Sequence, residues 1–172
     1  MPASRSLARS VGMAILVLLP AGVAAGEDDA EFAFRPATFR SDFPFGTAMA
    51  MTLALRWLQR PRCRDLFVQF QDSSGATLRA RLDASGETPE GYLSRIAFTK
   101  ANDRDRCTDG ALAVTAVGSP SVRLCSGFAS LLRRDPRAAA VVLIHEALHS
   151  LGLGENPPTS QEISRHIEAS CR

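Results

Sequence analysis

The sequence has no marked excess of positive charge, and this absence argues against a nucleic-acid partner. The whole chain has 20 basic and 18 acidic residues, and two of the arginines, Arg5 and Arg9, belong to an N-terminal segment that we expect to be removed. The remaining chain is then neutral. A nucleic-acid-binding domain usually carries a strongly basic stripe, so no nucleic acid is expected among the partners.

Long apolar runs are also absent after Leu19, so we expect no membrane span once the N-terminal segment is removed. The early run from Val11 to Leu19 is too short for a membrane anchor. It follows two arginines and precedes the small residues Val23 to Ala25, an order typical of an export signal. We therefore expect residues 1–25 to be a signal peptide and the mature protein to be secreted or periplasmic.

The four cysteines lack the short spacing that zinc fingers use, which argues against a cysteine-bound metal. An even number of cysteines in an exported chain instead favours two disulfide bonds. Three pairings are possible. We prefer Cys107 with Cys125, closing a loop around one strand, and Cys63 with Cys171, holding the end of the chain against the first helix.

Linkers and internal repeats are missing as well, so residues 26–172 are expected to form a single domain. The apolar pattern predicts an α+β fold, with a small mixed or antiparallel sheet packed on a buried helix. A first helix is expected over Phe45 to Gln59 and is ended by Pro61. The expected strands are Leu66 to Phe70, Thr77 to Leu82, Arg95 to Lys100, Ala111 to Val117 and Val122 to Cys125. The first two would form a hairpin around the turn Asp72 to Gly75.

The last third of the sequence changes to a helical period. We expect helices at Phe128 to Arg134, at Ala138 to Leu151, and from Thr159 or Ser160 to about Ala169. Asp135 would cap the middle helix, with Pro136 at its first position. This helix is apolar on almost every side and should lie in the core, and Gly152 would end it.

That buried helix contains His145-Glu146-Ala147-Leu148-His149, the His-Glu-x-x-His arrangement found in zinc peptidases. Histidines four residues apart lie on one helical face, so both imidazoles can bind one ion. Glu146 would lie beside that ion, where it can take a proton from a water molecule and return it to a leaving amine. Two core histidines satisfied by hydrogen bonds are the alternative interpretation.

With the residues that follow, this motif resembles the metzincin group of zincin-like metallopeptidases. Gly152 matches the family glycine, and Glu155 stands at the third-ligand position, where most members have histidine and some secreted bacterial relatives have aspartate. The resemblance covers Val141 to Glu155 and implies a zinc ion bound by His145, His149 and Glu155. No methionine follows the motif, unlike in the family, so we expect a minimal form of a zincin.

Two other residues, Glu162 and His166, are alternative third ligands because they lie four apart on the last expected helix. A solvated face of that helix is the competing interpretation for this pair. We prefer Glu155, since a ligand directly after a glycine break is easy to place. Tyr92 could stabilise the oxyanion of a peptidase reaction, although a partly buried surface position is the interpretation that we favour.

These residues predict a secreted zinc-dependent endopeptidase that acts on protein or peptide substrates, with Glu146 as general base and Zn²⁺ as cofactor. The resemblance also implies that an edge strand holds the substrate extended. The alternative is a secreted, non-catalytic binding domain with a structural zinc site. Glu146 favours the enzyme, because a structural site has no use for an unligated carboxylate beside the metal. The sequence leaves the cleavage specificity and the oligomeric state open.

Overall fold

The computed structural model describes residues 47–102, 107 and 110–172. All of them belong to one structural unit, residues 34–172. The expected signal peptide and the start of the expected mature domain lie outside the described residues.

The described residues form an α+β domain, which confirms the predicted fold class. Its helices are α1 (Thr47–Leu58), α2 (Pro61–Arg64), α3 (Leu66–Gln69), α4 (Leu78–Ser85), α5 (Pro89–Arg95), α6 (Ser126–Arg134), α7 (Pro136–Ser150) and α8 (Ser160–Cys171). The strands β1 (Ala97–Lys100), β2 (Ala113–Thr115) and β3 (Ser121–Leu124) form a three-stranded sheet in the order β1-β3-β2. Among the described residues, no helix has the length and apolarity needed to cross a membrane.

The sheet is mixed, because β3 pairs in parallel with β1 and antiparallel with β2. Strand β2 therefore forms one edge. Strands β1 and β2 fall within segments predicted to be strands, with shorter bounds, and Arg95 belongs to α5 instead. Strand β3 lies one residue before its predicted bounds. The turn between β2 and β3 is tied to α7 by a hydrogen bond of 2.9 Å from the amide of Gly118 to the carbonyl oxygen of His149. The edge strand and α7 are thus held in a fixed relation.

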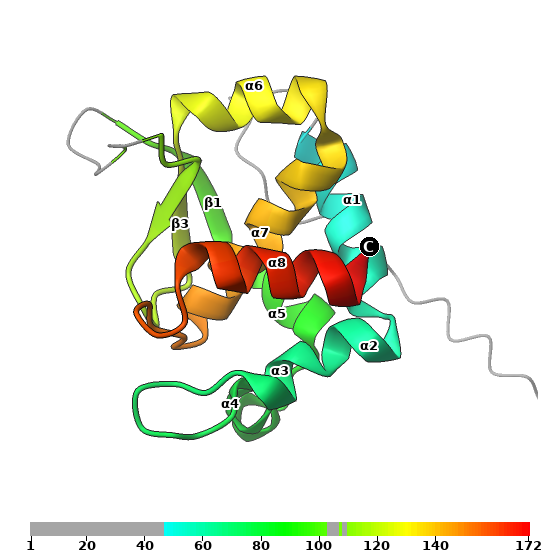
Figure 1. The fold of residues 1–172 in the computed structure, drawn as a ribbon, viewed down its shortest axis with the longest axis vertical. Coiled ribbons are helices and arrows are strands. Elements are labelled where there is room, and N and C mark those ends of the chain that lie inside the picture. Colours follow the sequence, from blue (N-terminus) through cyan, green and yellow to red (C-terminus); the bar gives the residue numbers. More distant parts are fainter. Residues whose placement is uncertain (1–46, 103–106, 108–109) are drawn as a thin grey trace, which may run out of the picture. The chain divides into compact units, whose positions relative to one another are not determined.

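Helix α7 lies in the middle of this domain (Figure 1) and contacts α1, α5, α6, α8, β2 and β3. From Ala139 to Leu151, every residue except Val142 is buried. A helix that is apolar on nearly all faces is stable in water only when other elements enclose it. The sequence of α7 therefore determines its central place, and α8 crosses over it.

The two ends of α7 follow the predicted capping. The Asp135 carboxylate accepts hydrogen bonds from the amides of Arg137 and Ala138, at 2.9 and 3.0 Å, and Pro136 takes the first helical position. After the helix, Gly152 has a φ of 119°, and a Cβ atom there would lie 3.2 Å from the Cβ of Asp72. Both the backbone angle and the limited space require glycine at this position.

The predicted strand over residues 66–70 is wrong, because α3 (Leu66–Gln69), directly after α2, occupies this part of the chain. The buried side chains are Cys63, Leu66, Phe67 and Phe70. Their spacing of three, one and three residues follows the period of a helix and not that of a strand. Pro61, expected only to end the first helix, begins α2.

The predicted strand over residues 77–82 is also wrong, because α4 begins at Leu78. Leu78 and Leu82 are buried while Ala80 is exposed, so the alternation that suggested a strand breaks at its middle position. Thr77 caps the helix by accepting a hydrogen bond from the amide of Ala80. The predicted turn is present, and a single bridge between Gln71 and Thr77 closes it.

Both predicted disulfide bonds are present. Cys107 is bonded to Cys125, and Cys63 to Cys171. The second bond fastens the end of α8 to α2, although these residues are 108 positions apart in the sequence. Two disulfides are typical of proteins that fold in an oxidising compartment.

Candidate metal centre

Two imidazole rings converge on one side of α7, one helical turn apart. The Nε2 atoms of His145 and His149 are 2.9 Å apart, and the ring centroids are 4.7 Å apart. Both residues are buried, with 7% and 6% of their surface exposed. The four-residue spacing in the sequence therefore brings the rings together as predicted.

Each ring is also held in place by a hydrogen bond at its Nδ1 atom. Nδ1 of His145 lies 3.1 Å from the Oγ of Ser164 on α8, and Nδ1 of His149 lies 2.7 Å from the carbonyl oxygen of Leu153. A carbonyl oxygen only accepts, so Nδ1 of His149 donates and its Nε2 offers a lone pair. The Oγ of Ser164 can accept from His145 in the same way. Such hydrogen bonds orient metal-binding histidines.

Glu155 completes the group from the loop after Gly152. Its Oε1 lies 3.2 Å from Nε2 of His149 and 3.8 Å from Nε2 of His145. Ligand atoms that surround a zinc ion tetrahedrally at about 2.0–2.1 Å lie about 3.3 Å from one another. The three separations of 2.9, 3.2 and 3.8 Å lie on either side of that value.

His145, His149 and Glu155 therefore form a group that could hold a metal ion, with all potential ligand atoms within 4.8 Å of one another. Within the part of the chain that the structure describes, no other group of three or more potential ligands is found. Two imidazoles and one carboxylate form a donor set that suits zinc and several other divalent metals.

Burial prepares His145 for metal binding by keeping its ring neutral. Burial, with a further contribution from His149, lowers the pKa of His145 to about 4. Metal binding requires the unprotonated ring. Protons therefore compete with a cation for His145 only in acid solution.

Glu146 is a buried carboxyl group beside this group of ligands. Burial, with a further contribution from the negative charge of Glu155, raises the pKa of Glu146 to about 7. Among the described residues, none forms a hydrogen bond or ion pair with its side chain. A carboxyl group with a pKa near neutrality can both take up and release a proton.

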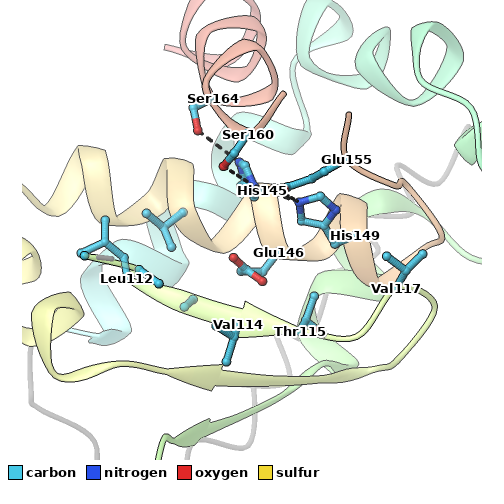
Figure 2. A pocket seen from close by; sticks show the side chains of 14 residues that line it. Leu112, Val114, Thr115, Val117, His145, Glu146, His149, Glu155, Ser160 and Ser164 are labelled. Carbon is cyan, nitrogen blue, oxygen red and sulfur yellow. Dashed lines mark hydrogen bonds and ion pairs between the residues drawn. The ribbon is translucent and has the colours of Figure 1, made fainter. Parts of the chain in front are cut away.

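A cavity of about 660 Å³ opens between α7, β2 and the start of α8 (Figure 2). One wall is formed by small and apolar residues of the segment 110–117, and α7 adds Val142. The other wall carries polar residues: His145, Glu146, His149, Glu155, Ser160 and Ser164. Figure 2 shows the Glu146 carboxylate directed into the space between α7 and β2. The possible ligands and the carboxyl group thus face one solvent-accessible cavity.

The alternative third ligands lie outside this group. Glu162 is engaged in the cap of α8, where its Oε2 accepts hydrogen bonds of 2.8 Å from the amide and the hydroxyl of Thr159. The ring of His166 packs against Phe70, with a centroid distance of 5.6 Å. The structure therefore brings Glu155, and neither alternative, to the two histidines.

Tyr92 takes the structural position that we favoured for it. Its hydroxyl donates a hydrogen bond of 2.9 Å to the carbonyl oxygen of Ser150, and burial raises its pKa. It does not line the cavity. The residue therefore fastens α5 to the end of α7.

Ser160 and Ser164 line the cavity but were not predicted from the sequence. They lie four residues apart, on the face of α8 that meets His145. This spacing, on a helix that follows directly after the proposed third ligand, is the signal that could have identified them. Their contribution depends on how α8 packs on α7, which a local pattern does not contain.

Comparisons with protein-family models, with curated proteins and with solved structures give no match for this chain.

Proposed function

We propose that this protein is a zinc-dependent peptidase of the zincin type, which hydrolyses peptide bonds of protein or peptide substrates outside the cytoplasm. The observation that carries the proposal is the placement of Glu146. Its buried carboxyl group faces a cavity of about 660 Å³ and is adjacent to three residues that could hold a metal ion. A site that only stabilised the fold would not need a proton-transfer group there.

Three protein ligands and an open cavity favour a catalytic metal over a structural one. Structural zinc is usually enclosed by four protein ligands, whereas catalytic zinc keeps one position open. Here two imidazoles and one carboxylate meet at the wall of the cavity, and Glu155 is 42% exposed. A zinc ion bound there would supply Lewis acidity, lowering the pKa of a water molecule and polarising a carbonyl group.

In this reaction the histidines would bind the metal and Glu146 would transfer the proton. His145 and His149 present their Nε2 lone pairs because Ser164 and Leu153 engage the opposite nitrogens. Glu146 takes one proton from the attacking water while the water oxygen forms a bond to the carbonyl carbon. When the bond between carbon and nitrogen breaks, Glu146 gives that proton to the leaving amine. The products are one carboxylic acid and one amine.

The wall opposite the ligands suits apolar parts of a substrate. Among the described lining residues, the segment 110–117 contributes no charged side chain. Strand β2 in this wall is an edge of the sheet, so an extended peptide could pair with its backbone. This arrangement supports peptide segments as the substrate class.

The proposal is tested with purified protein whose zinc content and peptide hydrolysis are measured together. Wild type should contain about one zinc ion per chain and cleave an unstructured peptide library. Glu146→Gln should keep the metal and lose hydrolysis by about 10²–10⁴-fold, because the proton carrier is gone. His149→Ala should lose both the metal and the activity.

His166→Ala is the matched control, because it removes an imidazole from α8 that packs against Phe70. It should behave as wild type in both measurements. Hydrolysis by Glu146→Gln at the wild-type rate would overturn the catalytic assignment. Metal retention with no hydrolysis of any peptide by wild type would point to the structural zinc site instead.

A further inference from the structure

We propose that Ser160 is a catalytic residue, whose hydroxyl group stabilises the carbonyl oxygen of the substrate while that oxygen gains negative charge. The inference rests on the proposed peptidase function and adds a residue to it. No motif in the sequence assigns a role to Ser160.

The position of Ser160 places its hydroxyl group at the reaction centre. It is the first residue of α8, it is exposed, and it lines the cavity. Its Oγ lies 3.5 Å from Nε2 of His145, the nitrogen that faces the other potential ligands. Figure 2 shows Ser160 next to His145. A carbonyl oxygen drawn toward the metal position would therefore come close to this hydroxyl.

The other hydroxyl groups near the cavity have different partners. Thr115 donates to the carbonyl oxygen of Ser121 at 2.8 Å. Ser164 lies behind the ring of His145, at Nδ1 and not at Nε2. The Tyr92 hydroxyl donates to the carbonyl oxygen of Ser150.

No arginine, lysine, asparagine or glutamine occurs among the described residues that line the cavity. Ser160 is therefore the neutral side-chain donor that remains for an oxyanion. Apart from its approach to His145, its hydroxyl has no hydrogen-bond partner among the described residues.

The reaction needs a hydrogen-bond donor that stabilises the carbonyl oxygen in the transition state without giving up its proton. As the water oxygen bonds to the carbonyl carbon, the π electron pair of the carbonyl moves onto its oxygen. The Ser160 hydroxyl donates a hydrogen bond to this oxygen and keeps its own proton. When the carbon–nitrogen bond breaks, the electron pair returns and the hydrogen bond weakens. A bond that is strongest in the transition state accelerates the reaction.

The closing experiment compares Ser160→Ala with Ser126→Ala. Ser126 is the matched control because it is also an exposed serine at the first position of a helix, α6, and it does not line the cavity. Ser160→Ala should lower kcat by about 10- to 100-fold with little change in KM, since one donor to the oxyanion is lost. Ser160→Thr, which keeps the hydroxyl group, should recover part of the rate. Ser126→Ala should match wild type.

Two further measurements separate this role from a structural one. Zinc affinity of Ser160→Ala should equal that of wild type. A phosphinic peptide, whose tetrahedral oxygens imitate the charged oxygen, should bind Ser160→Ala at least about tenfold more weakly, while the cleavage product binds equally well. Equal kcat values for Ser160→Ala and Ser126→Ala would overturn the role of Ser160 and leave the peptidase intact. Wild-type protein that holds zinc yet cleaves no peptide would overturn both proposals.

Discussion

Folding places the carboxyl group of Glu146 in surroundings where its charged form is unfavourable. It is 6% exposed and has a pKa of about 7, compared with an ordinary value of 4.5. In the metal-free protein, the folded state therefore keeps a proton that the unfolded chain releases. The resulting stability is complete below pH 4.5 and is lost as the pH rises through about 7.

This titration predicts how Glu146→Gln changes the stability of metal-free protein. The amide has no proton to lose, so the variant should avoid the loss of stability above pH 4.5. From pH 4 to pH 8 its free energy of unfolding should gain about 3 kcal/mol relative to wild type. Urea denaturation with a chelator present, at both pH values, measures this difference.

His145 acts in the opposite direction in both proteins. Its lowered pKa means that the unfolded chain takes up a proton below about pH 6.5, while the folded state resists protonation down to about pH 4. In Glu146→Gln, stability should therefore fall on acidification in that range, whereas in wild type the contribution of Glu146 opposes this fall. A difference between the variants that stays constant from pH 4 to pH 8 would contradict the raised pKa of Glu146.

Among the site residues, those that lie close together in the sequence could be predicted from it. His145, Glu146 and His149 fall within one turn of one helix, so their relative positions follow from helical geometry. Glu155 required only the additional glycine break. Ser164 and Ser160 come from another helix, and no local pattern contains the packing of α8 on α7.

Helix ends determine where the candidate ligands lie. Gly152 follows α7 with a φ of 119°, in a region of backbone conformation that residues with side chains rarely adopt. The chain then turns so that Leu153 accepts from His149 and Glu155 faces both rings. The end of α7 therefore contributes to the metal centre as much as its middle does.

Gly152→Ala should destabilise the protein by about 1–3 kcal/mol and weaken metal binding, because the new Cβ is strained and crowds Asp72. Gly154→Ala is the control. Gly154 has no positive φ, and no atom lies within 4 Å of the position of its Cβ. The control should stay within about 0.5 kcal/mol of wild type. Denaturation midpoints and zinc titrations check both variants, and equal behaviour of the two would refute the importance of the glycine break.

The failed hairpin shows the limit of prediction at the level of elements. Leu78, Ala80 and Leu82 alternate with arginines, which favours a strand, but Leu78 and Leu82 also lie four residues apart, which suits a helix. The exposed Ala80 decides for the helix. Its exposure depends on what packs against α4, so the short pattern alone could not distinguish the two periods. Longer segments such as α7 were predicted correctly as helices, because the apolar residues of several successive turns follow the helical period.

On the scale of the whole domain, the bond between Cys63 and Cys171 constrains the unfolded chain most strongly. It joins residues 108 positions apart, whereas the bond between Cys107 and Cys125 spans 18. The entropy of closing a loop grows with its length. We therefore expect the two bonds to differ in their contribution to stability.

Replacing Cys63 and Cys171 by alanine should lower the free energy of unfolding by about 5 kcal/mol, compared with about 3 kcal/mol for Cys107 and Cys125. Replacing the first pair should also weaken zinc binding more, because it releases α8 and with it the hydrogen bond between Nδ1 of His145 and the Oγ of Ser164. Guanidinium denaturation and zinc titration of the two double variants test this order. A larger effect of the shorter loop in both assays would contradict it.

The long disulfide has a consequence for a protein proposed to cut other chains. Any single break in the backbone between Cys63 and Cys171 leaves both pieces covalently joined, so that one self-inflicted nick would not shed a fragment. Such a nicked molecule would run as one band on a non-reducing gel and as two after reduction. Cleavage in an exposed loop would therefore leave the apparent molecular mass unchanged until the disulfide bond was reduced.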